Sequence, residues 1–530
     1  MDVSPTSLPD DVDALKSLLL EKQAIIDQHS QLLTKQKTRI EQLEEWLRLL
    51  RQQQFGQRSE KHTDQQELQF FNEAELLSTL AGDDDEVGPS ITVAAHQRQR
   101  KVARALPESL PRVDVIHDLS AEEKNCSCGQ NLQPIGEEVT EQLSVIPQQY
   151  YVIRHVKLKY ACSCRQCLRT AALPPQPLPG SQASAQLLAH TMVSKFHDGL
   201  PLYRQEKMAA REGLELARGK LARWLIGLVP LLQPLYNLLQ DTLFGYDIAQ
   251  TDETGIQVLK EPGREAQTKS YLWIRRGGPP GSPVVLVDYS PSKSGDTAYG
   301  LLNEFHGYLI SDAASNIKLC AERNALVPVY CNDHARRKFA EVLKAVKNKE
   351  KTKHWIAAKA IGYYKRLYRI ERQIKPLSAE QRYEQRQLQA VPIWESFLAW
   401  AEQVYSAGVA HQRTRQALEY LIGHAPELRR YCDDGRLPIS NIQSEHVAKT
   451  IALARKNFLF ADTPAGAAAS AMLYSVLESA KASGHNTHRY MAVVLTELPN
   501  ASSVEDIEAL LPWNITPETV DQHYATLPAP

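Results

Sequence analysis

Five short runs rich in β-branched and aromatic residues begin at about residue 245, and they constrain the fold more than any other feature of the chain. Turn residues bound each run, as expected for strands. Helical periodicity then extends from about 334 to 430. The chain therefore contains an α/β core followed by a long helical block. The five runs are YDIAQTDETGIQVL, SYLWIRRG, SPVVLVDYS, GYLISDAAS and ALVPVYCND.

Acidic residues stand where two of these runs are expected to end, Asp252 in QTDET and Asp312 in LISDAAS. A carboxylate at the tip of a buried strand costs free energy unless a cation meets it. Two such tips on adjacent strands would clamp a pair of magnesium ions, which prefer hard oxygen ligands. The alternative is a pair of surface acids near turns, and the pattern by itself leaves both open.

The N-terminal part contains one long helical pattern without Gly or Pro, over residues 12–54. An aliphatic residue recurs every seven positions, which predicts a coiled coil pairing two chains within an N-terminal region at 12–61. The second seam of the heptad is half polar, so a helix packed on its own subunit is the alternative. The recurring residues are Leu19, Ile26, Leu33, Ile40 and Leu47.

A linker is predicted over 62–110, and it carries the basic segment HQRQRKVAR at 96–104. Such an arm would follow phosphates, although a solvated linker is an equal alternative. Lys and Arg total 61 and Asp and Glu 62, so the overall charge does not indicate nucleic acid and any such signal is local.

Five of the eight cysteines fall in one window, which favours a metal site over a disulfide framework. Residues 149–160 alternate as a strand between the two cysteine pairs, so a hairpin would bring four thiolates to a closed structural Zn²⁺ site. We predict a zinc-binding module at 111–172, with Cys162 as a possible substitute ligand; free thiols in a small core are the alternative. The predicted ligands are Cys126, Cys128, Cys164 and Cys167.

A helical region is predicted at 180–243, with two helices separated by a turn near Gly213. A helix-turn-helix contacting DNA and two ordinary packed helices fit this pattern almost equally. No apolar run reaches the roughly 18 residues of a membrane span, and the N-terminus lacks the apolar stretch of a signal peptide. A soluble cytoplasmic protein without a membrane partner is therefore expected.

Ordered motifs over some 430 residues resemble those of the insertion-sequence-66 family of bacterial transposases. The resemblance extends along nearly the whole chain, and the order of the motifs is far more specific than any one of them. The motifs are FGQRSEK, PIGEEVTEQLSVIP, YYVIRHVKLKYAC, LPLYRQ, QTDETGIQVL, VDYSPSKSG, HARRKF, DDGRLPISN, RKNFLF and LYSVLESAK.

The resemblance implies a multidomain α/β protein with a ribonuclease-H-like catalytic core at 244–460. A helical insertion at about 340–432 would interrupt this core, and a C-terminal helical region would follow at 461–510. Asp252, Asp312 and Glu445 match the family's Asp, Asp, Glu triad. By this resemblance they would hold two Mg²⁺ (or Mn²⁺) ions per active site.

The activity that the resemblance implies is DNA transposition, in which a phosphodiester is hydrolysed at the element's end and the freed 3′ hydroxyl attacks target DNA. The expected partners are DNA, further copies of the chain in a homodimer or higher oligomer, and companion proteins of the same element. The expected place of action is the nucleoid in the bacterial cytoplasm. The rival functions are a catalytically inactive zinc-containing DNA-binding protein derived from a transposase and a nuclease that uses the same core without strand transfer.

Two basic groups, one after the strand that ends at about residue 330 and one after Glu445, are interpreted as contacts to DNA phosphates. The alternative for the first group is a solvated helix start. The first group is His334, Arg336, Arg337 and Lys338, and the second is Lys449, Arg455 and Lys456.

Glu478 is the competing candidate for the third carboxylate, because it also lies in an apolar helical segment. Glu445 is preferred because it follows the helical insertion and matches the family's final Glu.

Three segments depart from the family pattern. Ser440-Asn441-Ile442 stands where Asp-Asn-Asn is usual before the final Glu, and Ala313-Ala314 follows the second Asp where Gly-Tyr is usual. Asn332 replaces the Trp that usually precedes HARRKF.

Overall fold

The computed structural model describes residues 22–23, 112–114, 116, 142–143, 148–161, 168–344 and 355–529. The predicted coiled coil lies outside the described residues except for Lys22 and Gln23, which are helical. The basic arm at 96–104 also lies outside them, as do Cys126, Cys128, Cys162, Cys164 and Cys167.

Contacts divide the chain into two units, Asp83–Val152 and the rest of the chain. The sheet and the candidate site belong to the larger unit.

A mixed sheet forms the centre of the larger unit and contains the five predicted strands, whose existence is thereby confirmed. The strand order is β5-β4-β3-β6-β7; the pairs β5-β4 and β4-β3 are antiparallel, and the pairs β3-β6 and β6-β7 are parallel. The strands are β3 (Ile248–Gln257), β4 (Lys269–Gly277), β5 (Val284–Ser290), β6 (Tyr308–Ser311) and β7 (Val327–Tyr330).

The two parallel steps of the sheet each contain a helix, because parallel neighbours need a crossover connection. The crossover helices are α8 (Gly295–Leu302) and α9 (Ser315–Arg323), which pack with Trp273 and Ala249 on one face of the sheet. Side chains alternate between the faces of a strand, so Ile274 and Leu272 lie on the opposite face, in the largest apolar core.

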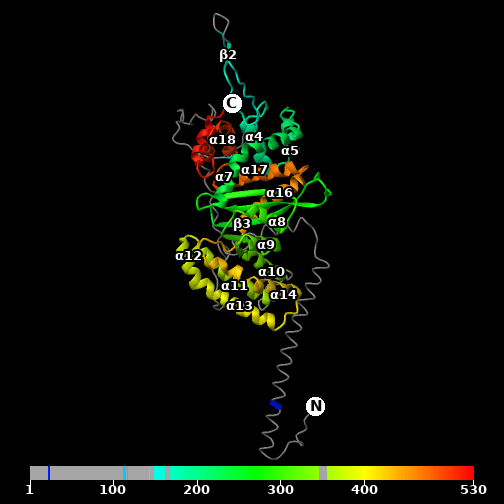
Figure 1. Ribbon diagram of the computed structural model, residues 1–530, viewed down its shortest axis with the longest axis vertical. Helices are drawn as coiled ribbons and strands as arrows, with labels where there is room; N and C mark the ends of the chain where they lie inside the picture. Colours follow the sequence, from blue (N-terminus) through cyan, green and yellow to red (C-terminus); the bar gives the residue numbers. More distant parts are fainter. Residues whose placement is uncertain are drawn as a thin grey trace, which may run out of the picture. The chain divides into compact units, whose positions relative to one another are not determined.

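That opposite face is covered by α16 (Ile442–Phe458) and α17 (Pro464–Ala482), drawn in orange beside the green sheet in Figure 1. Helix α17 is buried along most of its length. The hydroxyls of Ser475 and Ser479 accept hydrogen bonds from the backbone of β5, at 2.7 Å from Val287 N and 2.9 Å from Val285 N. These bonds fix the register of α17 on the strand.

Between residues 185 and 244, a described part of the chain, four helices precede the sheet, and their Leu-rich faces join the same core. Helix α5 ends at Arg211 and α6 begins at Arg218, with Gly213 between them at φ +77°, so the predicted helix, turn and helix are confirmed. Only a residue without Cβ adopts that φ at little cost. The four are α4 (Ala185–Phe196), α5 (Leu202–Arg211), α6 (Arg218–Gly227) and α7 (Val229–Phe244).

A helical block with its own apolar core stands between β7 and α16 and occupies the range in which an insertion was predicted. Aromatic rings fill that core; Tyr363 and Phe397 stack with ring centroids 4.5 Å apart. The block consists of α10 (Asn332–Lys344), α11 (Ile356–Ile374), α12 (Ala379–Gln385), the π-helical turn η3 (Arg386–Ala390), α13 (Val391–Ser406), α14 (Gln412–Gly423), α15 (Ala425–Arg429) and the 3-10 turn η4 (Arg430–Cys432).

Short helices complete the chain after α17. Helix α18 packs on α4, which joins the C-terminal segment to the helices that precede the sheet. These elements are α18 (Thr487–Glu497), η5 (Leu498–Asn500), α19 (Val504–Glu508) and α20 (Pro517–Thr526).

The strand predicted over 149–160 is much shorter in the structure. Strand β1 covers Lys159–Ala161 and pairs antiparallel with β2, Leu168–Thr170. Residues 149–158 are described and are not in a strand, and several are exposed, including Val152 and Val156. Alternation alone therefore predicted too long a strand here.

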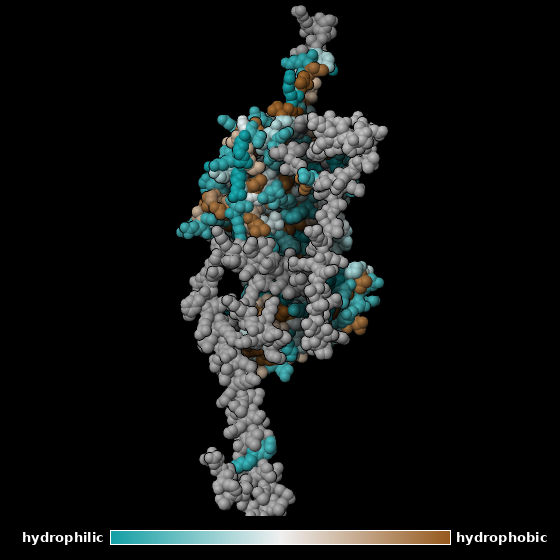
Figure 2. Space-filling model, turned by 180° about the vertical axis from the view of Figure 1, so that it is seen from behind, coloured by the Kyte–Doolittle hydropathy of each residue, from teal (hydrophilic) through white to brown (hydrophobic). Residues whose placement is uncertain are grey.

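The surface of the described residues is largely hydrophilic, with hydrophobic residues in scattered patches in the view of Figure 2. No helix in the described ranges is long and apolar enough to cross a membrane.

Candidate functional site

Asp252 lies within β3 and pairs with Ile274 of β4, so the prediction that it ends its strand is wrong. Strand β3 continues to Gln257, but its pairing with β6 stops at Gln250. Asp252 therefore stands just beyond the end of its parallel neighbour, where its carboxylate is only half-buried. Burial, followed by the charge of Glu445, raises the pKa of Asp252 to about 8.

Asp312 is the first residue after β6, at the point where that strand leaves the sheet. Its Oδ1 accepts a hydrogen bond from Ala314 N at 3.3 Å, and Ala314 caps the start of α9. The turn after β6 thus holds Asp312 at the same edge as Asp252. The register of β3 and β6 pairs Gln250 with Ile310, two residues before each of these acids, which places Asp312 near Asp252.

Glu445 lies in the first turn of α16, in the helix predicted for it, with its side chain 4% exposed. The N-cap residue Asn441 connects this helix to β3, because its Nδ2 donates to Thr251 O at 2.8 Å. One residue earlier in β3, Gln250 Nε2 donates to Gln443 Oε1 at 3.2 Å. These bonds position Glu445 against the strand that carries Asp252.

A thiol, an imidazole and a guanidinium surround the carboxylate of Glu445. Oε1 lies 3.4 Å from Cys331 Sγ and 3.3 Å from His334 Nδ1, while Oε2 lies 3.5 Å from Arg337 Nη2. Burial raises the pKa of Glu445 to about 7, with added contributions from Asp333 and Asp312 that Arg337 partly opposes. Burial, followed by the charge of Arg337, lowers the pKa of His334.

The structure thus brings together Asp252, Asp312 and Glu445 from a strand, a strand end and a helix. The charges of Glu445 and Asp312 raise the pKa of Asp252, and that of Asp312 raises the pKa of Glu445. A divalent cation relieves such repulsion and takes hard carboxylate oxygens as ligands. The donor set therefore fits Mg²⁺ or Mn²⁺.

Glu253 points away from this cluster, as the alternation of the strand predicts. It forms an ion pair with Lys293, which lies in the VDYSPSKSG segment after β5. Burial raises the pKa of Glu253, and Lys293 opposes that rise. The neighbouring acid of the QTDET motif therefore serves to hold the loop that contains Lys293.

The first basic group predicted to contact DNA divides between the surface and the interior. Arg336 is buried and lies 3.4 Å from Asp333, measured between Nε and Oδ1. Lys338 is exposed, with its Nζ 4.5 Å from the ring centroid of Tyr420. Arg337 lies between these extremes, beside Glu445, and His334 is 26% exposed.

The second basic group follows Glu445 along α16. Lys449 and Arg455 are half-buried, and Lys456 is exposed. Burial lowers the pKa of Arg455, whose guanidinium approaches Gly255 of β3. These side chains extend from the candidate site along the helix.

A cavity of about 960 Å³ opens beside the site, next to Gln250 and Gln443. Its walls come from the sheet, the helical block and the segment after α18. Cations predominate over acids in its lining, although Arg386 is paired with Glu371 and Arg436 with Asp247 and Asp434. The lining cations are Arg276, Arg372, Lys375, Arg382, Arg386 and Arg436.

Glu478, the competing third carboxylate, lies elsewhere, on α17. Its Oε1 is 3.2 Å from His197 Nε2, and its Oε2 is 3.5 Å from Lys481 Nζ. These two partners, the residue that caps the end of α4 and a residue of α17, form ion pairs with the buried carboxylate of Glu478.

Sequence reasoning missed two residues at the site, Cys331 and Asn441. Cys331 lies outside the cysteine window that predicts the zinc-binding module, although it stands three residues before His334, a spacing that occurs in metal sites. Asn441 was noted only as part of a departure from the family pattern. It is the middle residue of that segment and the one that bonds to β3.

Comparison with protein families gives a consistent result across the chain. The model described as Transposase IS66 family matches residues 180–469, more than half of the chain. The zinc-finger binding domain of transposase IS66 matches 123–165, and the IS66 C-terminal element matches 475–513. A leucine-zipper model described as Transposase C of IS166 homeodomain matches 42–115.

Relatives in Sinorhizobium fredii (strain NBRC 101917 / NGR234) match over most of their length. Uncharacterized protein y4jD is 32% identical over 463 residues, covering 84% of this chain and 89% of the relative. Uncharacterized protein y4qI is 28% identical over 544 residues, covering 97% and 98%. With the family matches, which support a transposase role, DNA as partner and a structural zinc, these likenesses show that the chain belongs to the IS66 family of transposases.

Proposed function

We propose that this chain is an active transposase that cleaves DNA at the ends of its element and transfers the 3′ ends into target DNA. The observation that carries the proposal is the convergence of Asp252, Asp312 and Glu445 from three separate segments, where burial and the charges of Glu445 and Asp312 raise the pKa of Asp252. Such carboxylates need cations, and phosphodiester chemistry needs two of them.

The sheet supports a ribonuclease-H-like core for this enzyme. Three antiparallel strands are extended by two parallel ones, and Asp252 stands on the central strand, with Asp312 after its parallel neighbour. Helix α16 crosses this strand and presents Glu445 after the helical block. In this proposal the block is an insertion between the second and third carboxylates.

Asp252, Asp312 and Glu445 would hold two Mg²⁺ or Mn²⁺ ions. Bound there, the ions would activate the attacking water or 3′ hydroxyl and stabilise the leaving oxygen. Arg337 lies beside Glu445 and is positioned to neutralise the scissile phosphate. Asn441 holds the helix in register, because the reaction depends on positioning more than on covalent catalysis.

The DNA would approach along the basic side chains that surround the carboxylates. Lys338 and Lys456 are exposed, whereas Arg336 is buried beside Asp333, so the exposed pair is better placed for phosphate contacts. The cavity beside Gln250 offers a second set of cations next to the catalytic strand. A coiled-coil homodimer or higher oligomer, and companion proteins of the element, would bring two DNA ends together.

The retained triad favours an active enzyme over a catalytically dead DNA-binding protein. The departures from the family pattern also leave the site assembled. Ser440 is buried, and Asn441, the middle residue of that segment, supplies the bonds that connect α16 to β3 and Cys331. Asn332 is fully buried where the family carries Trp, and its Nδ2 donates to Leu428 O at 2.9 Å.

The test is cleavage of labelled element-end DNA in Mg²⁺ by the full chain and by Asp252→Asn, Asp312→Asn and Glu445→Gln. Each substitution removes a ligand charge at nearly constant shape, so cleavage should be lost while DNA binding persists. Glu478→Gln is the matched control, because it also replaces a buried helical Glu. It should cleave if its circular dichroism is unchanged.

Full cleavage by Glu445→Gln would overturn the assignment of the third carboxylate. No cleavage by the unmodified protein, with suitable DNA and companions supplied, would favour the inactive DNA-binding protein. Joined products with target DNA distinguish transposition from nuclease activity, which yields cut ends alone.

A further inference from the structure

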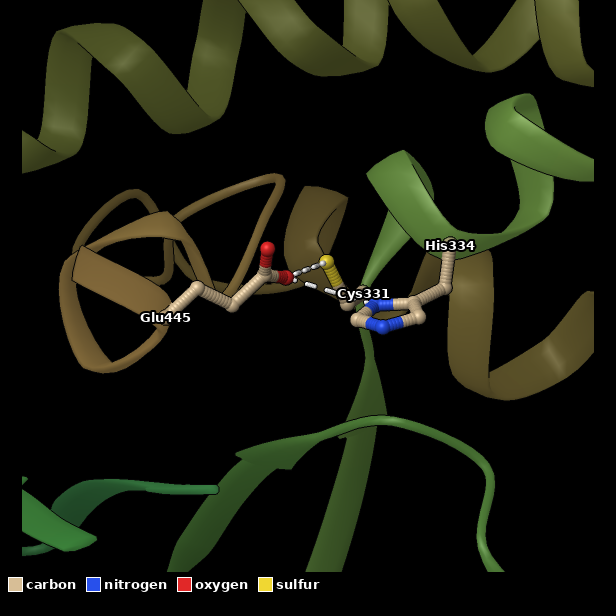
Figure 3. Close-up of side chains that lie close together, drawn as sticks. All are labelled: Cys331, His334 and Glu445. Carbon is tan, nitrogen blue, oxygen red and sulfur yellow. Dashed lines mark hydrogen bonds and ion pairs between the residues drawn. The ribbon is translucent and has the colours of Figure 1, made fainter. Parts of the chain in front are cut away.

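Three side chains of residue types that bind metals lie close together near the start of α10. A sulfur of Cys331, a ring nitrogen of His334 and a carboxylate oxygen of Glu445 all lie within 4.8 Å of one another (Figure 3). In Figure 3 the thiol and the imidazole point to the same oxygen of Glu445 from the end of β7 and the start of α10. Among the described residues, this group combines the sulfur, nitrogen and carboxylate ligands that are typical of zinc sites.

The separations match those between ligands around one small cation. Cys331 Sγ is 3.4 Å from Glu445 Oε1, and His334 Nδ1 is 3.3 Å from the same oxygen. Tetrahedral zinc, with bonds of about 2.0 to 2.3 Å, keeps its ligand atoms about 3.3 to 3.5 Å apart. The two separations from Glu445 thus suit ligands of one ion, and the third, between the sulfur of Cys331 and a ring nitrogen of His334, is within 4.8 Å.

The surrounding backbone supports the thiol as a ligand. Asn441 N donates to Cys331 Sγ at 3.2 Å, and Cys331 N donates to Ser311 O at 2.8 Å. Outer hydrogen bonds of this kind orient metal ligands. In addition, His334 Nδ1 and Glu445 Oε2 are buried without a hydrogen-bond partner among the described residues.

The two sides of Glu445 differ in the metals that they favour. Asp252 and Asp312 offer hard oxygens, which suit Mg²⁺. Cys331 and His334 offer sulfur and nitrogen, which select zinc and similar ions. Three protein ligands also leave a fourth tetrahedral position for water.

We propose that Cys331, His334 and Glu445 form a site for a soft divalent ion such as Zn²⁺, distinct from the zinc finger. The thiol proton passes to solvent when the sulfur binds the ion. Occupancy holds the Glu445 carboxylate at Cys331 and His334 as a zinc ligand. The carboxylate is then unavailable to an ion shared with Asp252, so zinc inhibits the magnesium-dependent reaction. The inhibition rests on the proposed function, whereas the binding of zinc does not.

Zinc content of the full-length protein tests the site without DNA or catalysis. The protein is equilibrated with excess Zn²⁺, desalted and subjected to elemental analysis. The unmodified chain should retain about one zinc more than Cys331→Ser and His334→Gln, because each variant removes one of three ligands. Equal zinc in all three proteins would overturn the proposal.

Matched controls separate ligation from folding. Cys320→Ser replaces another fully buried thiol, on α9, and should retain as much zinc as the unmodified chain. If Cys331→Ser is misfolded by circular dichroism, His334→Gln decides, because that side chain is 26% exposed and its replacement opens no buried cavity. Loss of the additional zinc in Cys320→Ser as well would contradict the assignment.

Inhibition is measured as cleavage with added zinc relative to each protein's own zinc-free rate. Zinc should reduce this ratio at least tenfold more in the unmodified chain and in Cys320→Ser than in Cys331→Ser. Equal ratios in all three proteins would refute the proposal that bound zinc keeps the Glu445 carboxylate from the magnesium site. A failure of all cleavage would count against the proposed function alone, because the zinc count is independent of it.

Discussion

Asn441→Ala should reduce catalysis far more than it reduces stability. The Asn441 side chain is fully buried at the start of α16, and its Nδ2 donates to Thr251 O at 2.8 Å, one residue before Asp252. Truncation leaves that carbonyl without its donor, while the backbone N–H that donates to Cys331 Sγ remains. The helix then loses a direct connection to the strand that carries the first carboxylate.

The magnitudes follow from one buried hydrogen bond. Leaving a buried acceptor unsatisfied costs about 1 to 3 kcal/mol, which lowers the melting temperature by a few degrees in a domain of this size. A displacement of about 1 Å at a reacting centre can cost about 10²-fold in rate. We therefore expect a modest loss of stability and a loss of cleavage on the order of 10 to 100-fold.

Asn324→Ala provides the matched control for this prediction. Asn324 Nδ2 donates to Leu302 O at 2.9 Å, in a part of the fold that does not touch the carboxylates. Thermal unfolding and Mg²⁺-dependent cleavage should be measured for both variants. If Asn441→Ala melts like Asn324→Ala and cleaves within about threefold of the unmodified protein, Asn441 does not position Glu445.

Three other predictions concern protonation, zinc and assembly. Burial and the charge of Glu445 raise the pKa of Asp252 from 3.8 to about 8, so ionisation destabilises the metal-free fold above that pH, and this effect is absent below the ordinary pKa. In EDTA, Asp252→Asn should therefore melt above the unmodified chain at about pH 9, with a difference that shrinks towards about pH 5; a constant difference would contradict this. Cys164→Ser should reduce the zinc content of the finger and Cys162→Ser should not; the reverse result would identify Cys162 as the ligand. Deletion of residues 12–54 should yield a smaller oligomer in sedimentation, and an unchanged mass would favour a helix packed within its own subunit.

Local patterns predicted the elements of the fold well. The five strands, the turn at Gly213 and the helix around Glu445 follow from periodicity and turn residues, which act over a few positions. The order of the strands and the face on which each helix packs depend on distant pairings, which periodicity does not contain. The family resemblance, and not the pattern, indicated which acids belong together.

The details of the site depend on contacts that no local pattern shows. Cys331 and Glu445 are 114 positions apart, and Thr251 and Asn441 are 190 apart. The HARRKF motif likewise does not show that Arg336 is buried beside Asp333, whereas Arg337 lies beside Glu445. The sequence pattern predicts a strand end at Asp252 because it does not distinguish the end of β3 from the end of the neighbouring strand β6.

The burial of α17 has a consequence for damaged copies of the gene. A protein that stops before Pro464 retains the segments proposed to hold the three carboxylates but leaves the apolar face of β5, including Val285 and Val287, without its cover. Exposed apolar strands promote aggregation. Copies of the element that have lost their 3′ coding sequence should therefore yield insoluble protein, which would not compete with the intact transposase for element ends in the same cell.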